Sequence, residues 1–294
     1  MKCIEFATRF DLSDAEYALL APFFPPEHSG KAGRPWASHR KTLDGIFWIL
    51  RTGAPWRDLP ACYGPFSTVH NRLTRWRQNG LWRKMLDKLQ SMARRLGRID
   101  FSMGDLDGSV VRAHKAAAGA RKGADQSPEQ SRQNQALGQS RGGMTTKIHV
   151  LSEGQGKHIT GLITPGQEAE VQQAEKLLDA VAIGGKPGPP RRRFERIGGD
   201  KGYDSEPLRQ GVRRRGSRPV IAYRKLKDGT YPARAKNFDK QAYRRRSVVE
   251  CLFGRLKEWR SIATRYAKLG QNFLALILLG FIRIWVIDLL RYRP

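Results

Sequence analysis

Cysteine is scarce in this sequence, and the few cysteines form no recognisable pattern. The 294 residues include Cys3, Cys62 and Cys251, which are far apart and contain no Cys-x-x-Cys pair. Disulfide-dependent secreted proteins and zinc ribbons carry paired or closely spaced cysteines. The sequence therefore argues against both classes, and it predicts a protein of a reducing compartment, the cytoplasm.

Long apolar runs are also few. Residues 1–10 lack the unbroken apolar stretch of a secretory signal. Residues 273–290 are strongly apolar, but they include Arg283 and Asp288 and barely reach the length that spans a membrane. We therefore expect this segment to be a buried helix, and we expect no membrane partner.

Acidic residues are half as numerous as basic ones. The chain has 27 Asp and Glu against 54 Lys and Arg, which gives a formal net charge of +27. Such a surplus repels itself, and it persists most easily in a protein whose partner is a polyanion, most commonly nucleic acid. Ribosomal and histone-like proteins share the charge but are usually shorter and poorer in Trp, of which this chain has seven. The charge therefore indicates the class of partner and not the activity.

Helical signals fill the first hundred residues. Ser13-Asp14-Ala15-Glu16 fits a capping box, and a later helix is expected to close at Gly53. Apolar side chains at helical spacing predict three further helices: Leu43, Ile46, Phe47 and Leu50; Val69, Leu73 and Trp76, after Ser67 or Thr68 as N-cap; and Trp82, Met85, Leu86 and Leu89.

The helix that follows residue 67 carries polar and basic residues away from its apolar side. Arg72 and Arg75 are among them. Two helices joined by a turn, with the second presenting such residues, are what a helix-turn-helix needs to enter a DNA major groove. An ordinary helical bundle with a solvated basic face fits the same pattern equally well.

Strand signals replace helical ones near residue 101. Strands are expected at 101–112, 145–151, 157–164, 193–199 and 218–223, and helices at 168–181, 206–215 and 239–260, before the apolar C-terminal helix. Residues 116–143 have almost no large apolar side chain and predict a mobile basic loop. Three strands followed by helix, strand, helix, strand and a long helix is the order of a ribonuclease H-like fold. We therefore expect a mixed α/β protein, with a helical, helix-turn-helix-like DNA-binding domain at 1–98 and a ribonuclease H-like domain at 99–294.

Two carboxylates lie in suggestive places along the expected strands. Asp107 is in the middle of the first strand, and Asp200 follows a later strand between glycines that allow a ligand to approach closely. Asp105 shares the strand face of Asp107 and is an alternative to it. Asp204 is a weaker alternative to Asp200 and is expected to be a helix N-cap. An isolated Asp beside glycines is most often only a turn residue.

A third carboxylate has more informative neighbours. Tyr243, Arg246, Glu250 and Lys257 fall within about 60° of one helix face at about 100° per residue. A carboxylate flanked by two cations on one stripe can take a metal ion while the cations hold a phosphate. Taken alone, the stripe also fits a solvated face with i, i+4 ion pairs.

Other residues of chemical interest have ordinary explanations. His114 and His149 lack a spaced partner for a metal site, and hydrogen-bonded structural histidines are commoner. Cys251 is expected to be a packing residue. The basic clusters 191–193 and 213–215 fit solvated faces that also grip a DNA backbone.

The Tyr-x2-Arg-x3-Glu-x6-Lys spacing resembles the signature of transposases of the insertion-sequence five family. Gly-Asp-Lys-Gly-Tyr-Asp at 199–204 and Asp-Gly-Ser-Val-Val-Arg-Ala-His at 107–114 resemble that family's two aspartate motifs. Residues 51–60, 140–149 and 262–266 are similar to further stretches, so the resemblance covers nearly the whole chain. Residues 165–170, Pro-Gly-Gln-Glu-Ala-Glu, depart from it, because relatives often carry a His-Asp pair there.

The resemblance implies an Asp-Asp-Glu triad formed by Asp107, Asp200 and Glu250. It implies two Mg²⁺ ions, for which Mn²⁺ can substitute, with Asp107 bridging them and the other two acids each holding one. Such a site cuts a phosphodiester and joins the freed 3′-hydroxyl to target DNA by in-line displacement. It also implies a dimer or larger assembly on transposon-end and target DNA, with Tyr243, Arg246 and Lys257 near the phosphates. Two other functions stay open: a metal-dependent nuclease that cuts without joining, and a DNA-binding regulator.

Overall fold

The computed structural model describes residues 10–27, 37–120, 130–131, 134–140 and 142–291. Internal contacts divide the chain into two compact units. The N-terminal unit comprises Met1–Leu89, Leu256–Thr264 and Gln271–Pro294, and the sheet unit comprises Gln90–Arg255 and Arg265–Gly270. The C-terminal helix is thus grouped with the first helices, which a division of the chain at residue 98 does not anticipate.

The N-terminal unit is helical, and local sequence signals set several of its helix ends. Ser13 and Glu16 form the expected capping box before α1 (Asp14–Leu20), and Gly53, with φ 70°, ends α2 (His39–Thr52) in the left-handed region. The predicted N-cap of α3 (Phe66–Gln78) is wrong. The helix begins at Phe66 with Pro65 as N-cap, because the fixed φ of proline suits the start of a helix. Short 3₁₀ turns connect these helices: Ala21–Phe23, Trp56–Asp58 and Ala61–Tyr63.

Two long helices complete the core of this unit. α4 (Leu81–Arg95) begins in it and buries Trp82, Met85, Leu86 and Leu89 as expected, and α11 (Gly270–Arg291) runs near the C-terminus. Among the described residues, α11 alone is long and apolar enough to cross a membrane, but 72% of its most apolar window is buried inside the protein. Leu279, Ile282 and Trp285 are fully enclosed. The helix therefore has the burial of a core helix, as expected.

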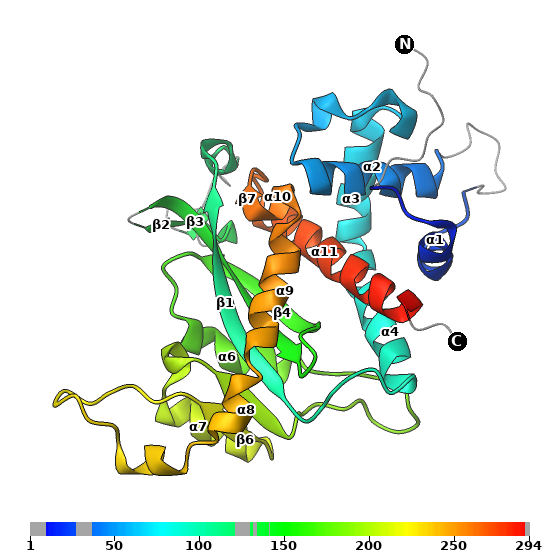
Figure 1. Cartoon of the computed structure of the whole chain (residues 1–294). Helices are drawn as coiled ribbons and strands as arrows, with labels where there is room; N and C mark the ends of the chain where they lie inside the picture. Colours follow the sequence, from blue (N-terminus) through cyan, green and yellow to red (C-terminus); the bar gives the residue numbers. More distant parts are fainter. Residues whose placement is uncertain (1–9, 28–36, 121–129, 132–133, 141, 292–294) are drawn as a thin grey trace. The chain divides into compact units, whose positions relative to one another are not determined.

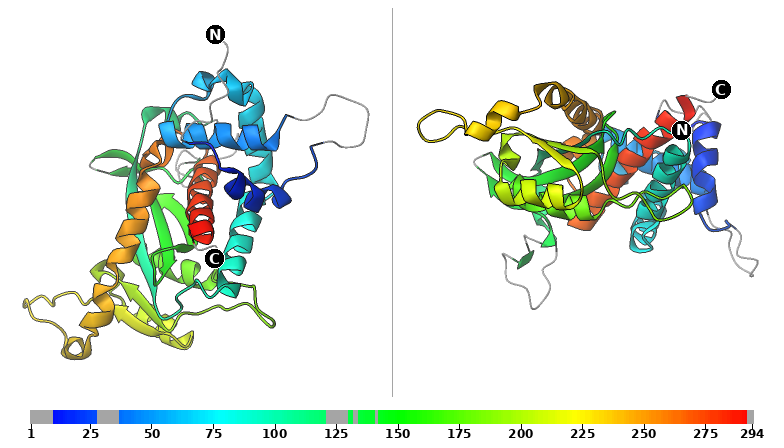
Figure 2. Two further views of the ribbon diagram at one scale, coloured as in Figure 1. Left: turned by 45° about the vertical axis from the view of Figure 1, so that its right-hand side comes forward. Right: turned by 90° about the horizontal axis from the view of Figure 1, so that it is seen from below.

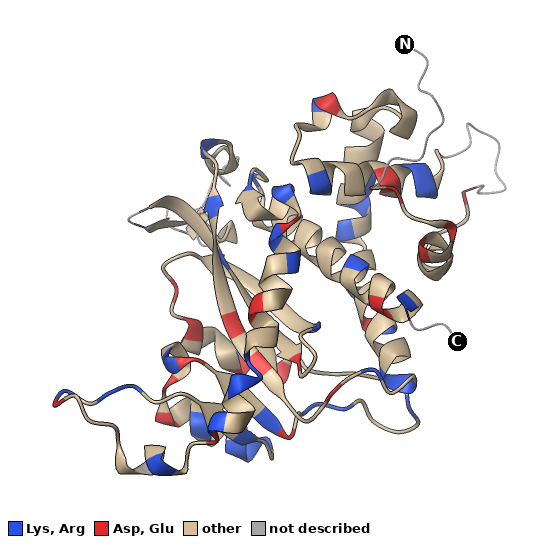
Figure 3. Cartoon of the chain, in the orientation of Figure 1, with Lys and Arg blue, Asp and Glu red and all other residues tan. Residues whose placement is uncertain are grey.

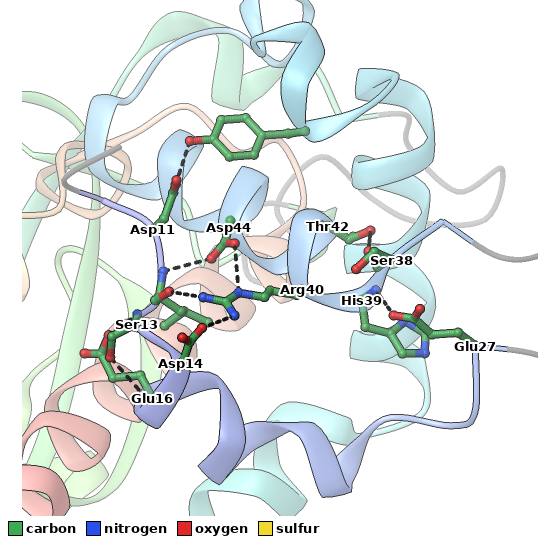
Figure 4. Close-up of polar contacts among 12 residues, drawn as sticks. Asp11, Ser13, Asp14, Glu16, Glu27, Ser38, His39, Arg40, Thr42 and Asp44 are labelled. Carbon is green, nitrogen blue, oxygen red and sulfur yellow. Dashed lines mark hydrogen bonds and ion pairs between the residues drawn. The ribbon is translucent and has the colours of Figure 1, made fainter. Parts of the chain in front are cut away.

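A polar network ties α1 to α2 within the same unit. Asp44 accepts a hydrogen bond of 2.9 Å from the backbone N–H of Leu12, and its other oxygen lies 3.9 Å from Arg40 Nε. Figure 4 shows that Arg40 reaches back toward Asp14, with which it forms an ion pair. The acids in this region each face a backbone or side-chain donor.

The sheet unit has the strand order of a ribonuclease H-like fold, as predicted. β1 (Gly104–Ala113), β3 (Gly143–Glu153) and β4 (His158–Pro165) form an antiparallel meander. β5 (Arg196–Gly199) and β6 (Arg218–Ile221) extend the sheet on the other side of β1, parallel to it. β2 (Gly138–Ser140) pairs with β3, and β7 (Thr264–Arg265) pairs with β1.

Two helices connect the strands of the sheet unit and lie side by side. α6 (Glu170–Asp179) connects β4 to β5, and α7 (Glu206–Arg214) connects β5 to β6. Figures 1 and 2 show α6 beside α7, with α9 (Ser247–Lys257) crossing the sheet on the other side. β1 is paired on both sides, with β3 along its length and with β5 at Gly104 and Asp105.

Two expectations about the sheet unit need correction or stay untested. The long helix predicted at 239–260 is wrong: α8 (Lys240–Arg244), α9 (Ser247–Lys257) and α10 (Arg260–Ala263) are separate. A tight turn at Arg245 and Arg246 breaks it, and both side chains pair with acids, Asp100 at 2.7 Å and Asp107 at 2.9 Å. Residues 121–129, 132–133 and 141, where a mobile basic loop is expected, lie outside the described residues.

Candidate active site

Asp107 lies in the middle of β1 with one face in contact with a cation. Its Oδ1 is 2.9 Å from Arg246 Nη2 and accepts a hydrogen bond of 2.9 Å from the N–H of Gly108. Burial, with smaller contributions from the charges of Glu170 and Asp200, raises the pKa of Asp107 to about 6 against the lowering effect of Arg246. Asp107 is therefore a carboxylate in an acidic neighbourhood that one guanidinium partly neutralises.

Asp105 precedes it on the same strand face but is fully enclosed. Neither of its carboxylate oxygens has a hydrogen-bond partner, and burial raises its pKa to about 7. Its strand partner is Gly198 of β5, where a side chain would collide with Asp105 Oδ1. The side chain of Asp107 keeps 14% of its exposure. Asp107 is thus the better placed of the two to meet a ligand.

Asp200 directly follows β5, as the sequence indicates, and is the N-cap of the 3₁₀ turn Lys201–Tyr203. Its Oδ1 accepts a hydrogen bond of 2.8 Å from the N–H of Gly202. Asp204 is not the N-cap predicted for it: Ser205 precedes α7. Asp204 instead pairs with Arg209 at 2.8 Å and accepts the N–H of Arg224 at 2.7 Å. Asp204 is thus committed to structural contacts.

Glu250 lies in the first turn of α9 with a side chain that is 67% exposed. Arg246 Nη1 is 3.6 Å from Glu250 Oε1, so one guanidinium contacts both Glu250 and Asp107. Burial lowers the pKa of Arg246, but the charges of Asp107 and Asp200 outweigh it and hold that pKa above its usual value. Figure 3 shows acidic positions of β1 and α9 close to basic ones at the start of α9. Acids from β1 and α9 thus share one cation, and the charge of Asp200 after β5 acts on it.

The donor atoms in this region suit a hard divalent cation. Carboxylate oxygens are the ligands that Mg²⁺ and Mn²⁺ prefer, and the buried Tyr203 Oη has no hydrogen-bond partner. Within the described part of the chain, no three Asp, Glu, His or Cys side chains are close enough to hold an ion as placed. Like charges repel, and Arg246 lies where a cation between Asp107 and Glu250 would lie. Closing of the acids around an ion would therefore involve a shift of Arg246.

The residues expected to contact DNA are in different environments. Tyr243 is half-buried on α8, with its ring 5.2 Å from that of Phe238. Lys257 is exposed at the end of α9, in the N-terminal unit. Arg72 is half-buried, 2.6 Å from His39 Nδ1, whereas Arg75 is exposed on α3. Of the two arginines on α3, Arg75 is the one presented to solvent.

The secondary candidates have structural roles, with one exception. His149 is buried and 2.8 Å from Thr164 Oγ1, and burial lowers its pKa to about 4. His114 Nδ1 accepts the N–H of Ala116. Several arginines of the basic clusters form ion pairs, such as Arg215 with Asp179 at 2.6 Å. Cys251, expected to be a packing residue, is exposed, because it is on the solvent side of α9 beside Glu250.

Sequence reasoning missed three residues that border Asp107 and Asp200. They are Lys147 on β3, Glu170 at the start of α6, and Tyr203 after Asp200. Glu170 lies in the segment 165–170, and it contacts the glycines that follow the two aspartates, Gly108 and Gly202. Gly108, directly after Asp107, and Gly202, two residues after Asp200, were the available signal for a side chain packed closely against both segments.

Comparison with known proteins identifies the family. Residues 100–285 match the model of the transposase DDE domain, and residues 12–86 match that described as "Putative transposase of IS4/5 family". The chain is 36% identical over 107 residues to a 16.2 kDa protein of insertion element IS402 from Burkholderia cepacia, covering 35% of this chain and 73% of that protein. It is 27% identical over 143 residues to the "Putative transposase for insertion sequence element IS6501" of Brucella ovis, covering 49% and 99%.

Among solved structures, the chain is similar to that of the Mos1 strand transfer complex. The two are 13% identical with a TM-score of 0.26, and 87% of this chain and 78% of that one are covered. Since that score is low, the fold assignment rests on the strand order of the sheet unit. The family model covers more than half of the chain, and the chain belongs to the family of transposases with a DDE domain.

Proposed function

We propose that this DNA transposase binds transposon ends, cleaves their phosphodiester bonds and joins the freed 3′-hydroxyl to target DNA, with two divalent metal ions held by Asp107, Asp200 and Glu250. One observation carries this proposal. Arg246 is 2.9 Å from Asp107 and 3.6 Å from Glu250, and Asp200 contributes to the field around it. Asp107 and Glu250, which are 143 residues apart in sequence, therefore pair with the same guanidinium, which a single structural ion pair does not require.

The acids would hold the metal, and the basic residues would hold DNA. Bound Mg²⁺ ions supply an activated nucleophile and stabilise the leaving oxygen. In cleavage, a water oxygen bonds to phosphorus and the bond to the 3′-oxygen breaks, with a proton lost from water and one gained by that oxygen. In joining, the 3′-hydroxyl attacks a target phosphodiester and displaces the target's own 3′-oxygen. Arg246, freed from Asp107, would pair with a phosphate, as guanidinium groups do well.

DNA is the proposed partner, and we expect residues outside the acidic site to contact it. The net charge of +27 suits a polyanion. Tyr243 and Lys257 flank Glu250 in sequence, and Arg75 is exposed on α3. We assign these residues, with Arg72 as a second residue of α3, to the DNA-binding surface. We expect a homodimer or larger assembly across two transposon ends, acting in the cytoplasm on nucleoid DNA.

The test is cleavage and joining of candidate end DNA in Mg²⁺ by wild type and Glu250→Gln. The variant keeps the size of the side chain but loses the charge, so we expect both reactions to fall by roughly 10³-fold, since metal stabilisation amounts to several kcal/mol. Glu258→Gln is the matched control, because the Glu258 side chain is 63% exposed and Glu250 is 67% exposed. Glu258→Gln should retain wild-type activity.

Each of the other outcomes would assign a different function to this chain. Cutting without joining by wild type would indicate a nuclease of the same fold. DNA binding without cutting, on several end sequences and in both Mg²⁺ and Mn²⁺, would indicate a DNA-binding regulator. Equal activity of wild type and Glu250→Gln would remove Glu250 from the metal centre.

A further inference from the structure

Glu170 occupies the first position of α6, at the edge of the proposed catalytic centre. Ala169 is the N-cap, and the Glu170 side chain is 22% exposed. An acid in the first turn of a helix is stabilised by the unpaired N–H groups there, which explains why Glu170 begins α6. It does not explain where the Glu170 side chain points, which depends on the groups around its carboxylate.

The Glu170 carboxylate lies between the backbones that carry the two aspartates. An ideal Cβ on Gly108, which follows Asp107, would be 2.9 Å from Glu170 Oε1. An ideal Cβ on Gly202 would be 3.6 Å from Glu170 Oε2 and 2.8 Å from Asp200 Oδ1. Glu170 thus directs one oxygen to each segment. Any larger residue at position 108 would displace it.

The sheet leaves room for this approach. The pairing of β1 with β5 covers Gly104 and Asp105, before the position of Asp107. β5 ends at Gly199, so the chain at Asp200 leaves the sheet where Asp107 lies on β1. A carboxylate from α6 can therefore reach both segments at the end of the parallel pairing.

Tyr203 is a second and independent sign that something binds here. Its side chain is fully buried, and its Oη has no hydrogen-bond partner. Burial, followed by the charges of Glu170, Asp107 and Asp200, raises the pKa of this phenol well above its usual value, so the charges of the same three acids act on this hydroxyl. A buried hydroxyl without a partner is costly, unless a ligand or its water completes it.

We propose that Glu170 is a fourth carboxylate of the metal centre, which strengthens binding of the ion at Asp107 and Asp200 by accepting hydrogen bonds from the ion's bound water. Mg²⁺ gives up its water reluctantly and usually keeps several molecules, so outer carboxylates orient it. Tyr203 Oη is placed to take part in the same water network. This inference rests on the proposed metal-dependent function, because it uses the same ion.

A purely structural role for Glu170 predicts a different result. Lys147 Nζ is 3.4 Å from Glu170 Oε1 and donates to the carbonyl of Glu168 at 2.9 Å. If Glu170 served only to pair with Lys147, loss of either side chain would disturb stability alike and leave metal binding unchanged. If Glu170 helps to hold the ion, loss of Lys147 would leave the Glu170 carboxylate without a neutralising cation. The ion would then bind more tightly. The two roles therefore differ in the sign of the Lys147 effect.

The experiment is titration of the full-length protein with Mn²⁺ in the absence of DNA, with free Mn²⁺ followed by electron paramagnetic resonance. Outer-shell partners contribute roughly 10- to 100-fold to metal affinity. We expect Glu170→Gln to weaken Mn²⁺ binding by at least about 10-fold, and Lys147→Met to tighten it. Glu175→Gln is the matched control, because it removes the same charge from an exposed position of the same helix. It should bind Mn²⁺ like wild type.

The outcomes separate this inference from the proposed function. If Asp107→Asn loses Mn²⁺ binding while Glu170→Gln binds like wild type, the role of Glu170 is refuted and the triad stands. If Asp107→Asn also binds like wild type, the metal centre itself is refuted. Thermal melts of all variants identify unfolding. Should Glu170→Gln not fold, tighter binding by Lys147→Met still supports the proposal, and unchanged binding overturns it.

Discussion

Two regions of this protein bury acids beside arginine, and they differ in how far the buried polar atoms have hydrogen-bond partners. In the N-terminal unit, burial raises the pKa of Asp44 to about 6, yet its carboxylate accepts the N–H of Leu12 and lies near Arg40. Figure 4 shows each acid of that region directed at a donor. Such a network fixes the path of the chain before α1 against α2, and its role ends there.

The sheet unit gathers acids around Arg246 and leaves buried polar atoms beside them without a hydrogen-bond partner. Asp107 and Glu250 both pair with Arg246, and the charge of Asp200 acts on it; the oxygens of Asp105 and the hydroxyl of Tyr203 have no partner. Uncompensated buried polar groups cost free energy, so they persist where something other than the fold requires them. The comparison teaches that burial and a raised pKa do not identify a catalytic acid. The sheet unit is distinguished instead by the buried atoms of Asp105 and Tyr203, which have no hydrogen-bond partner.

The largest contrast is expected from the same substitution in both regions. Asp107→Asn should lower DNA cleavage and joining by roughly 10³-fold, because an amide is a poor metal ligand. Asp44→Asn should leave both reactions within about twofold, since its carboxyl serves only the packing of α1 and α2. Rates on end DNA in Mg²⁺, with melting temperatures as the check on folding, decide this. Equal loss in both variants would mean that the acids differ less than the structure indicates.

The next contrast concerns the arginines. Arg246→Met should destabilise the protein by roughly 2–4 kcal/mol at pH 8, because Asp107 would be left charged in a nearly buried position. The Arg246 and Asp107 side chains are 11% and 14% exposed. Arg40→Met should cost less, roughly 1–2 kcal/mol, since Asp14 is 93% exposed and the buried Asp44 is 3.9 Å away and keeps its hydrogen bond from Leu12.

The pH dependence of the Arg246→Met penalty has a definite sign. Asp107 has a folded pKa of about 6, above the unfolded value of about 3.9. An acid with a raised pKa loses stability as pH rises between those values, and loss of Arg246 would raise the pKa further. The free energy of unfolding of Arg246→Met, measured with urea, should therefore be close to that of wild type at pH 5 and clearly lower than that of wild type at pH 8. A penalty independent of pH would show that Arg246 acts through packing.

The smallest contrast compares two tyrosine hydroxyls. Tyr63 Oη donates to Asp11 at 2.6 Å, so Tyr63→Phe should cost roughly 0.5–1.5 kcal/mol. Tyr203→Phe removes a buried hydroxyl without a partner, so in metal-free buffer it should be neutral or stabilising by up to about 1 kcal/mol. Denaturant midpoints measure both. A loss for Tyr203→Phe as large as that for Tyr63→Phe would mean that its hydroxyl is already satisfied.

Local signals predicted much of the fold. The capping box at Ser13 and the left-handed Gly53 end helices through contacts within a few residues, and apolar spacing identified Leu73 and Trp76 as buried. The break at Arg246 escaped prediction, because it is linked to Asp107, a residue remote in sequence. The position of Glu170 escaped for the same reason, since only folding brings α6 against Gly108 and Gly202.

The sequence by itself determined the family, the strand order and the three acids proposed for catalysis, because motif spacing and hydrophobic periodicity are properties of neighbouring residues. The tertiary structure decided which acids share a cation, which lie without a partner, and that α11 is grouped with the first helices. These depend on distance between remote segments and on the burial that follows. Electrostatic energies vary with both, so no reading along the chain could have supplied them.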